Sequence, residues 1–174
     1  MRRPTLVLVV LAAALAVALP ALAASPHFKK NGVPTCTDTG ATLSCSGALA
    51  GLGNADVILE LSAAGQASFA CVNPGGNEAP GQNKVPFTAS NTVTIPGSEV
   101  KNGNLSFTIS APKTPPTATP EEAGCPNGNW TTRLRDVEFG NVTLKISQTG
   151  LLFTCTYPGQ IPNGGTVTLS CTPA

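Results

Sequence analysis

Hydrophobic and polar positions alternate along most of the chain, as they do in strands that bury one face. Val, Ile, Thr, Phe and Leu dominate these stretches, and such residues suit a pleated sheet. Outside the first residues, no segment shows the period of an amphipathic helix. The pattern predicts strands at 42–48, 56–61, 67–72, 91–95, 105–110, 131–139, 142–147, 151–157 and 166–172.

Short strands separated by 18 Gly and 16 Pro favour an all-β architecture. We therefore predict an antiparallel immunoglobulin-like β-sandwich of eight or nine strands, where the term describes the layout only. A closed barrel is the alternative.

One short pattern occurs twice: residues 69–76 read FACVNPGG and residues 153–160 read FTCTYPGQ. The preceding segments, LELSAAGQ at 59–66 and LKISQTG at 144–150, are also alike. Each copy suggests a β-hairpin, with turns ending at Gly65 and Gly150. The similarity has two explanations, an old duplication or the shared demands of two hairpins in one sandwich, and we favour the second.

The first 23 residues have the features of a secretory signal peptide. Arg2 and Arg3 precede the uncharged apolar run 6–19, and Ala21 and Ala23 give the small-x-small pattern of a cleavage site. The run is shorter than the roughly 20 residues of a membrane-spanning helix. We expect cleavage after Ala23, an N-terminal tail at 24–35 and one sandwich domain at 36–174, with a Pro/Thr-rich loop near 110–124.

Removal of the leader leaves 151 residues with eight basic and nine acidic side chains. A chain of this length suits one domain. Because its charges are few and scattered, we expect no nucleic-acid binding, which needs clustered Lys and Arg. We expect a monomer that, after cleavage, has no membrane association.

The cysteines all lie in the exported part, where an oxidising compartment favours disulfides. Zinc is disfavoured because no Cys-x-x-Cys pair occurs and His27 is the single histidine. The turn-forming residues 37–44 and 157–166 would bring two pairs together, and elimination gives the third. We predict three disulfides, Cys36–Cys45, Cys155–Cys171 and Cys71–Cys125. A Cys71–Cys155 bridge between the two sheets is the alternative.

Two long segments, 73–86 and 110–129, separate the predicted strands. The second contains a Pro/Thr-rich run expected to be extended and solvated. Each is either a tolerated insertion or a recognition surface. Trp130 follows the second segment and either closes one end of the core, which we favour, or lies open beside the loop.

Four segments, HFKKNGVPTCTDTG at 27–40, GLGNADV at 51–57, NPGGNEAPGQN at 73–83 and CPNGNWTTRLRDVEF at 125–139, resemble a group of small exported actinobacterial proteins. The resemblance implies export and an all-β, disulfide-bonded domain. It implies no activity and transfers no catalytic residue.

Catalytic patterns are absent from the sequence: there is no nucleophile elbow, phosphate loop or His-Glu-x-x-His. Asp136 and Glu138 share a strand face beside Arg133 and Arg135, as expected of a solvated charge cluster. The other acidic candidates, Asp56, Glu60, Glu121 and Glu122, are expected at the surface. We therefore expect no enzyme activity, cofactor site or metal site.

The remaining function classes are binding functions. We predict a secreted or cell-wall-associated, non-enzymatic interaction module, with an extracellular protein or a cell-wall glycan as partner. A carbohydrate-binding module is the alternative, with Trp130 and Tyr157 as the candidate contacts because sugars stack on aromatic rings. Small-molecule carriage is the third hypothesis.

Overall fold

The computed structural model describes residues 25–174, and the predicted leader, its cleavage site and Ala24 lie outside that range. The described chain is all-β, with eleven strands and the short 3-10 turn η1 (Gly97–Glu99). No helix in this part of the chain is long and apolar enough to span a membrane.

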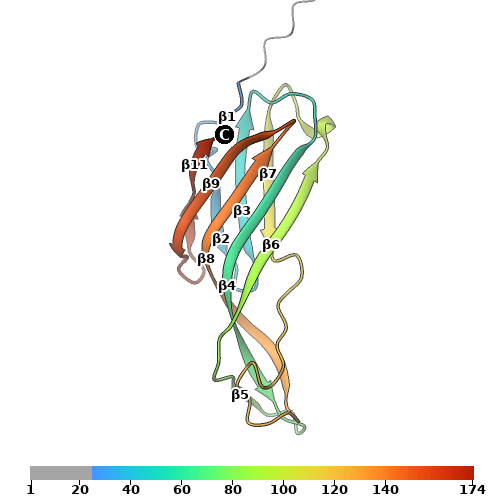
Figure 1. Ribbon diagram of the computed structural model, residues 1–174, viewed down its shortest axis with the longest axis vertical. Helices are drawn as coiled ribbons and strands as arrows, with labels where there is room; N and C mark the ends of the chain where they lie inside the picture. Colours follow the sequence, from blue (N-terminus) through green and yellow to red (C-terminus); the bar gives the residue numbers. More distant parts are fainter. Residues whose placement is uncertain (1–24) are drawn as a thin grey trace, which may run out of the picture.

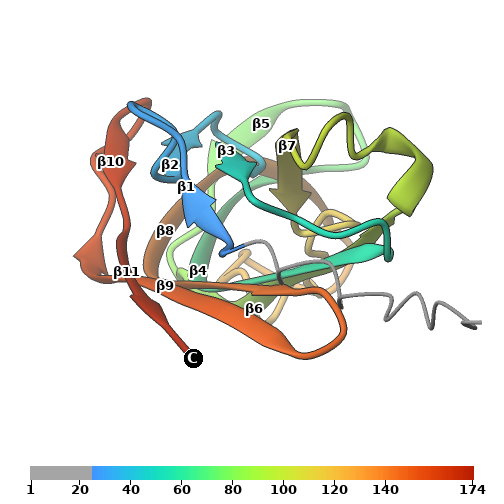
Figure 2. The same cartoon turned by 90° about the horizontal axis from the view of Figure 1, so that it is seen from above.

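The strands form two separate antiparallel sheets, which makes the fold a β-sandwich and not the closed barrel. Figure 2 shows the two layers from above. In the five-stranded sheet, β3 pairs with β1, β2 and β7, and β10 extends beyond β2. Its strands are β1 (His27–Phe28), β2 (Thr35–Asp38), β3 (Leu43–Ala50), β7 (Leu105–Ala111) and β10 (Thr166–Thr168).

The six-stranded sheet has the order β11-β9-β8-β4-β5, with β6 also paired to β4. Its strands are β4 (Val57–Val72), β5 (Glu78–Pro80), β6 (Val85–Ile95), β8 (Thr131–Ser147), β9 (Leu151–Gln160) and β11 (Ser170–Pro173). This layout confirms the predicted antiparallel sandwich, and its immunoglobulin-like character stays a prediction.

The core lies between the sheets because every second side chain of the long strands points inward. On β4 the residues at alternate positions from Val57 to Phe69 are buried, and β7 shows the same alternation. Each fully buried Val, Leu, Ile or Phe contributes about 1.5–3 kcal/mol relative to exposure. The largest fully buried side chains include Phe139, Leu43, Leu49, Leu59, Leu61, Ile109, Leu144 and Ile146.

The three predicted disulfides are confirmed, and no cysteine in the described residues is free. Cys36 and Cys45 are direct partners across β2 and β3, and Cys155 and Cys171 are partners across β9 and β11. Cys71 is joined to Cys125, so the alternative Cys71–Cys155 bridge is wrong.

The hairpin predicted with a turn at Gly65 is wrong, because one continuous strand, β4, covers both of its predicted arms. Gly65 pairs with Phe87 on one side and Phe139 on the other. The second predicted hairpin is confirmed: β8 and β9 are joined through Gln148–Gly150, where the Gln148 amide donates to the Gly150 carbonyl.

Other predicted boundaries also change. The strands predicted at 131–139 and 142–147 are one strand, β8, with an irregularity between Gly140 and Val142. The strand predicted at 166–172 is divided into β10 and β11, which belong to different sheets. The predicted tail contains β1, and the predicted loop 73–86 contains β5.

Candidate binding surface

An extension of the six-stranded sheet projects beyond the sandwich. Its strand residues are 68–72 of β4, β5 and 131–135 of β8, and the irregular segment 112–130 packs beside them; we call this part the arm. Figure 1 shows it at the lower end, opposite the C-terminus. Phe69, Ala70, Cys71 and Ala123 are buried at the arm, and Phe69 and Ala123 belong to the sandwich core.

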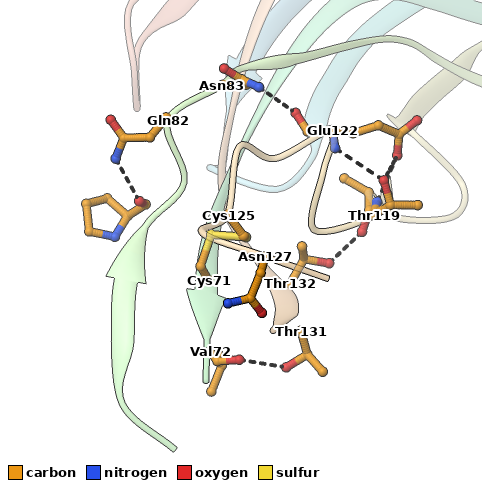
Figure 3. The surroundings of a disulfide bond; sticks show 12 residues. Cys71, Val72, Gln82, Asn83, Thr119, Glu122, Cys125, Asn127, Thr131 and Thr132 are labelled. Atoms are coloured by element: carbon orange, nitrogen blue, oxygen red, sulfur yellow. Dashed lines mark hydrogen bonds between the residues drawn. A yellow bond between two sulfur atoms is a disulfide. The ribbon is translucent and has the colours of Figure 1, made fainter. Parts of the chain in front are cut away.

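A disulfide and side-chain hydrogen bonds fix segment 112–130 on the arm (Figure 3). The disulfide joins Cys71 of β4 to Cys125. Thr132 Oγ1 donates to the Ala118 carbonyl at 2.6 Å, and Asn83 Nδ2 donates to the Glu122 carbonyl at 3.2 Å. Residues 113–119 of the Pro/Thr-rich run contain no helix or strand and are mostly exposed. The residues that follow the run are held beside the strands by the contacts of Glu122 and Cys125.

A single turn at 119–124 shapes the second half of segment 112–130. The Thr119 amide and hydroxyl donate to Glu122 Oε2 at 2.8 and 3.0 Å, and the Glu122 amide donates to Thr119 Oγ1 at 3.2 Å. These reciprocal bonds form a capping box. The backbone amide of Thr119 and then its hydroxyl hold the pKa of Glu122 below its usual value, because both bind the charged form.

Ion pairs link charged side chains at the arm and its base. Arg133 and Arg135 of β8 both pair with Glu78 of β5, and Lys84 pairs with Glu138. The predicted charge cluster of Asp136, Glu138 and the two arginines is thus divided: the arginines reach β5, and Glu138 has a lysine partner. Such exposed pairs contribute about 0–1 kcal/mol each.

The structure does not bring the two candidate aromatic contacts together. Trp130 immediately precedes β8 at the end of the arm, whereas Tyr157 pairs with Val142, twelve positions along β8. At about 3.3 Å per residue this is a separation of roughly 40 Å along the strand. Tyr157 packs against the sandwich core. Trp130 is half-buried and is not part of that core, so the prediction that it closes the core is wrong.

A shallow groove of about 190 Å³ lies on the outer face of the six-stranded sheet, across β4, β6 and β8. Strand register places hydroxyl side chains in a row across five strands, Ser170–Thr156–Thr143–Ser62–Ser90. The adjacent row, Thr172–Thr154–Lys145–Glu60–Thr92, contains one base and one acid side by side. Neighbouring side chains within a row are about 4.8 Å apart, the distance between adjacent strands. Glu60 lies at the surface, as predicted. The groove was not predicted, because strand alternation shows which residues face outward but not which strands are neighbours.

The other acidic candidates, Asp56, Glu121 and Glu122, lie in loops and turns and do not gather into a site. Asp56 accepts a hydrogen bond from the Gly97 amide at 2.8 Å, which fixes the loop after β6. Glu121 and Glu122 lie on the arm turn. The described residues contain no cluster of three or more His, Cys, Asp or Glu side chains arranged for metal binding.

Two buried polar residues were missed from the sequence. Gln148 accepts a hydrogen bond from the Gly53 amide and donates to the carbonyls of Gly53 and Ala55, so it fastens the β3–β4 loop to the β8–β9 turn. Asp38 is 2% exposed. The alternation of TCTD at 35–38 places Asp38 on the same face as Cys36, a signal that could have identified it.

No family model matches the chain, and no curated protein is similar to it. Among solved structures, Bacteroides uniformis β-glucuronidase is 17% identical over 86% of this chain, with a TM-score of 0.26. The match spans 14% of that enzyme's length. A likeness this weak carries no argument about function.

Proposed function

We propose that the mature chain is a secreted or cell-wall-associated module that binds a partner and catalyses no reaction. The arm is the observation that carries the proposal. Its segment 112–130 lacks regular strands and is fixed by a disulfide and side-chain hydrogen bonds. Irregular connections longer than roughly 12–15 residues are uncommon in compact domains and are usually functional or disordered. Because this one is ordered, binding through it has a low entropic cost.

The proposed compartment is extracellular. Three disulfides support it, since such bonds persist in oxidising environments. The leader pattern of residues 1–23 points the same way. We further propose that the mature protein is a monomer without affinity for nucleic acid, because its near-neutral charge offers no basic patch.

The absence of catalysis is part of the proposal, and the arrangement of the surface acids supports it. Glu138 forms an ion pair with Lys84, and Glu78 forms ion pairs with two arginines. Asp56 accepts a hydrogen bond from a backbone amide. Glu60 lies beside Lys145 in an open groove on a sheet face, where water has free access. An acid in such a place lacks the desolvation that tunes catalytic carboxyl groups.

Carbohydrate binding is the second candidate, and the hydroxyl-lined groove favours it. An uncharged row of five hydroxyls can both donate and accept hydrogen bonds along a polyhydroxylated chain. Trp130 stays a candidate contact on the arm, but it and Tyr157 are too far apart to form one stacking platform. For the third hypothesis, small-molecule carriage, the place to test is the depression of about 380 Å³ beside Gln148.

Co-sedimentation with purified actinobacterial cell walls tests the proposal. The wild-type mature protein should be retained on the walls. If the arm binds, Trp130→Ala should reduce retention several-fold; if the groove binds, Ser62→Arg should do so. Thr108→Ala, on the other sheet, is the matched control and should bind normally. Absence of retention, equal retention by all variants, or release of soluble sugars from the walls would contradict the proposed function.

A further inference from the structure

A buried carboxylate oxygen lies without a partner at the end of β2. Asp38 is 2% exposed. Its Oδ1 accepts a hydrogen bond from the Gly40 amide at 2.8 Å, but its Oδ2 is buried with no hydrogen-bond partner. Buried polar atoms are nearly always paired because an unpaired one loses its hydration without compensation. This oxygen is therefore free to bind a further donor or a cation.

A second carboxyl group lies next to it on the opposite sheet. A Cβ built on Gly40 would be 3.7 Å from Asp136 Oδ1, and the Gly40 amide itself binds Asp38. The Gly40 carbonyl accepts a hydrogen bond from the Val137 amide at 2.8 Å, which fixes the β2–β3 turn against β8. Both carboxyl groups therefore lie close to Gly40.

The β9–β10 loop supplies a third group. Asn163 Nδ2 donates to Asp136 Oδ2 at 2.8 Å, which places the amide group of Asn163 at the same junction. The loop is anchored there because the Asp38 amide donates to the Gly165 carbonyl at 3.0 Å. Three segments distant in sequence therefore bring two carboxylates and one side-chain amide together.

No lysine or arginine in the described part of the chain forms an ion pair with either acid. Among residues 25–174, the ion pairs are Lys84–Glu138, Arg133–Glu78 and Arg135–Glu78, and none involves Asp38 or Asp136. Burial, and to a smaller extent the charges of Asp136 and Glu138, raise the pKa of Asp38 against the opposing effect of the Gly40 hydrogen bond. A buried acid beside another acid is costly until a proton or a cation joins it.

We propose that this junction binds a divalent cation, Ca²⁺, through the carboxylates of Asp38 and Asp136 and the amide oxygen of Asn163. Ca²⁺ prefers carboxylate and amide oxygens in flexible geometry and completes its shell with water. With two carboxylates only, the affinity should be that of extracellular modules, with a Kd of about 10⁻⁴–10⁻³ M. This site departs from the expectation of no metal site, because Asp38 and Asp136 are distant in the sequence and come together only in the folded chain.

The site would link the two sheets at the base of the arm. Asp38 belongs to the five-stranded sheet, and Asp136 lies on β8, which continues into the arm. A bound cation would hold these strands and the β9–β10 loop together. This inference does not depend on the proposed function, because it concerns the base of the arm and not the partner.

Calorimetric titration of chelator-treated mature protein with CaCl₂ tests the proposal. We expect one saturable site with a Kd of about 10⁻⁴–10⁻³ M and a rise in Tm of several degrees in excess Ca²⁺. Asp38→Asn and Asp136→Asn should abolish both effects. Glu60→Gln, which removes an exposed carboxylate elsewhere, is the matched control and should respond like the wild type. Absence of saturable binding, or an unchanged response in Asp38→Asn, would overturn the proposal.

A gain-of-function variant distinguishes a cation from a proton as the partner of Asp38 Oδ2. Asn163→Asp adds a third carboxylate, so it should lower Tm in chelator and tighten Ca²⁺ binding about tenfold. Circular dichroism in chelator establishes that each variant is folded. If Asn163→Asp binds no Ca²⁺ and Asp38→Asn is simply more stable than the wild type, Asp38 is a protonated acid and the site is not a metal site.

Discussion

Cys71, buried near the end of β4, is bonded to Cys125, which lies 54 residues further along the chain in the irregular segment of the arm. This is the one disulfide that does not join paired strands. Replacing both cysteines by serine should therefore release segment 112–130 while the sandwich stays folded. Loop-closure entropy predicts a loss of about 4 kcal/mol in the free energy of unfolding.

Limited proteolysis measures where this variant opens. Cleavage should concentrate within 112–124 and leave the sandwich intact. The matched control replaces Cys155 and Cys171, which close a loop of 16 residues; it should lose about 3 kcal/mol without exposing the arm. An identical cleavage pattern in the two variants would show that the other contacts of the arm suffice to hold the segment.

Among the polar side chains, Gln148 should cause the largest loss in the free energy of unfolding when it is truncated. Gln148→Ala leaves the amide and carbonyl of Gly53 and the carbonyl of Ala55 without their partner. We expect a loss of about 2–4 kcal/mol in denaturant unfolding and faster hydrogen exchange at the Gly53 amide. Gln160→Ala, at an exposed position, should change stability by less than about 0.5 kcal/mol. Equal effects of the two substitutions would contradict the assigned role.

Truncation of Trp130 should lower the free energy of unfolding less than truncation of a buried aromatic residue does. The ring is half-buried and outside the sandwich core. Trp130→Ala should lose about 1 kcal/mol, whereas Phe139→Ala, at a position with no exposed surface, should lose about 3–5 kcal/mol. Urea unfolding of both variants gives the comparison. A loss above 3 kcal/mol for Trp130→Ala would show that the ring supports the arm.

The capping box of the arm predicts a pH dependence. The Thr119 hydrogen bonds lower the pKa of Glu122 in the folded state. The folded state therefore binds its proton less readily than the unfolded state, so the stabilisation is present above the unfolded pKa of about 4.3 and is lost as pH falls through the lower folded value. Thr119→Ala should raise the Glu122 pKa in an NMR titration of the carboxyl carbon. Thr117→Ala is the control and should leave it unchanged.

Local turn chemistry explains which features were predictable. The turn residues between Cys36 and Cys45, and those between Cys155 and Cys171, reverse the chain over a short distance, so these pairings follow from spacing. The β8–β9 turn at Gly150 was predictable for the same reason. Features that depend on the opposite sheet were not predictable. The unpaired oxygen of Asp38 and its proximity to Asp136 arise only when β2 and β8 are packed together.

Gly65 shows most clearly what the local sequence could not predict. A glycine after LELSAA predicts a turn, since glycine weakens a strand interior. Here the ring of Phe87 on β6 lies over it instead, so that a Cβ at position 65 would clash with Phe87 Cε1. An aromatic side chain covering a glycine on the neighbouring strand stabilises such a position. The local sequence would be the same for a glycine in a turn and for a glycine inside a strand, so only the pairing with β6 distinguishes the two cases.

This contact predicts strong coupling between Gly65 and Phe87. Gly65→Ala should displace the Phe87 ring and lower the free energy of unfolding by about 1–3 kcal/mol, as overpacking does. In a Phe87→Leu background the same substitution should be neutral or stabilising, because the clash is gone and alanine costs less entropy in a strand than glycine. Gly128→Ala, where an added Cβ meets no atom within 4 Å, is the control. A coupling energy below about 0.5 kcal/mol in the double-mutant cycle would mean that the ring moves aside freely and that Gly65 is not required for packing.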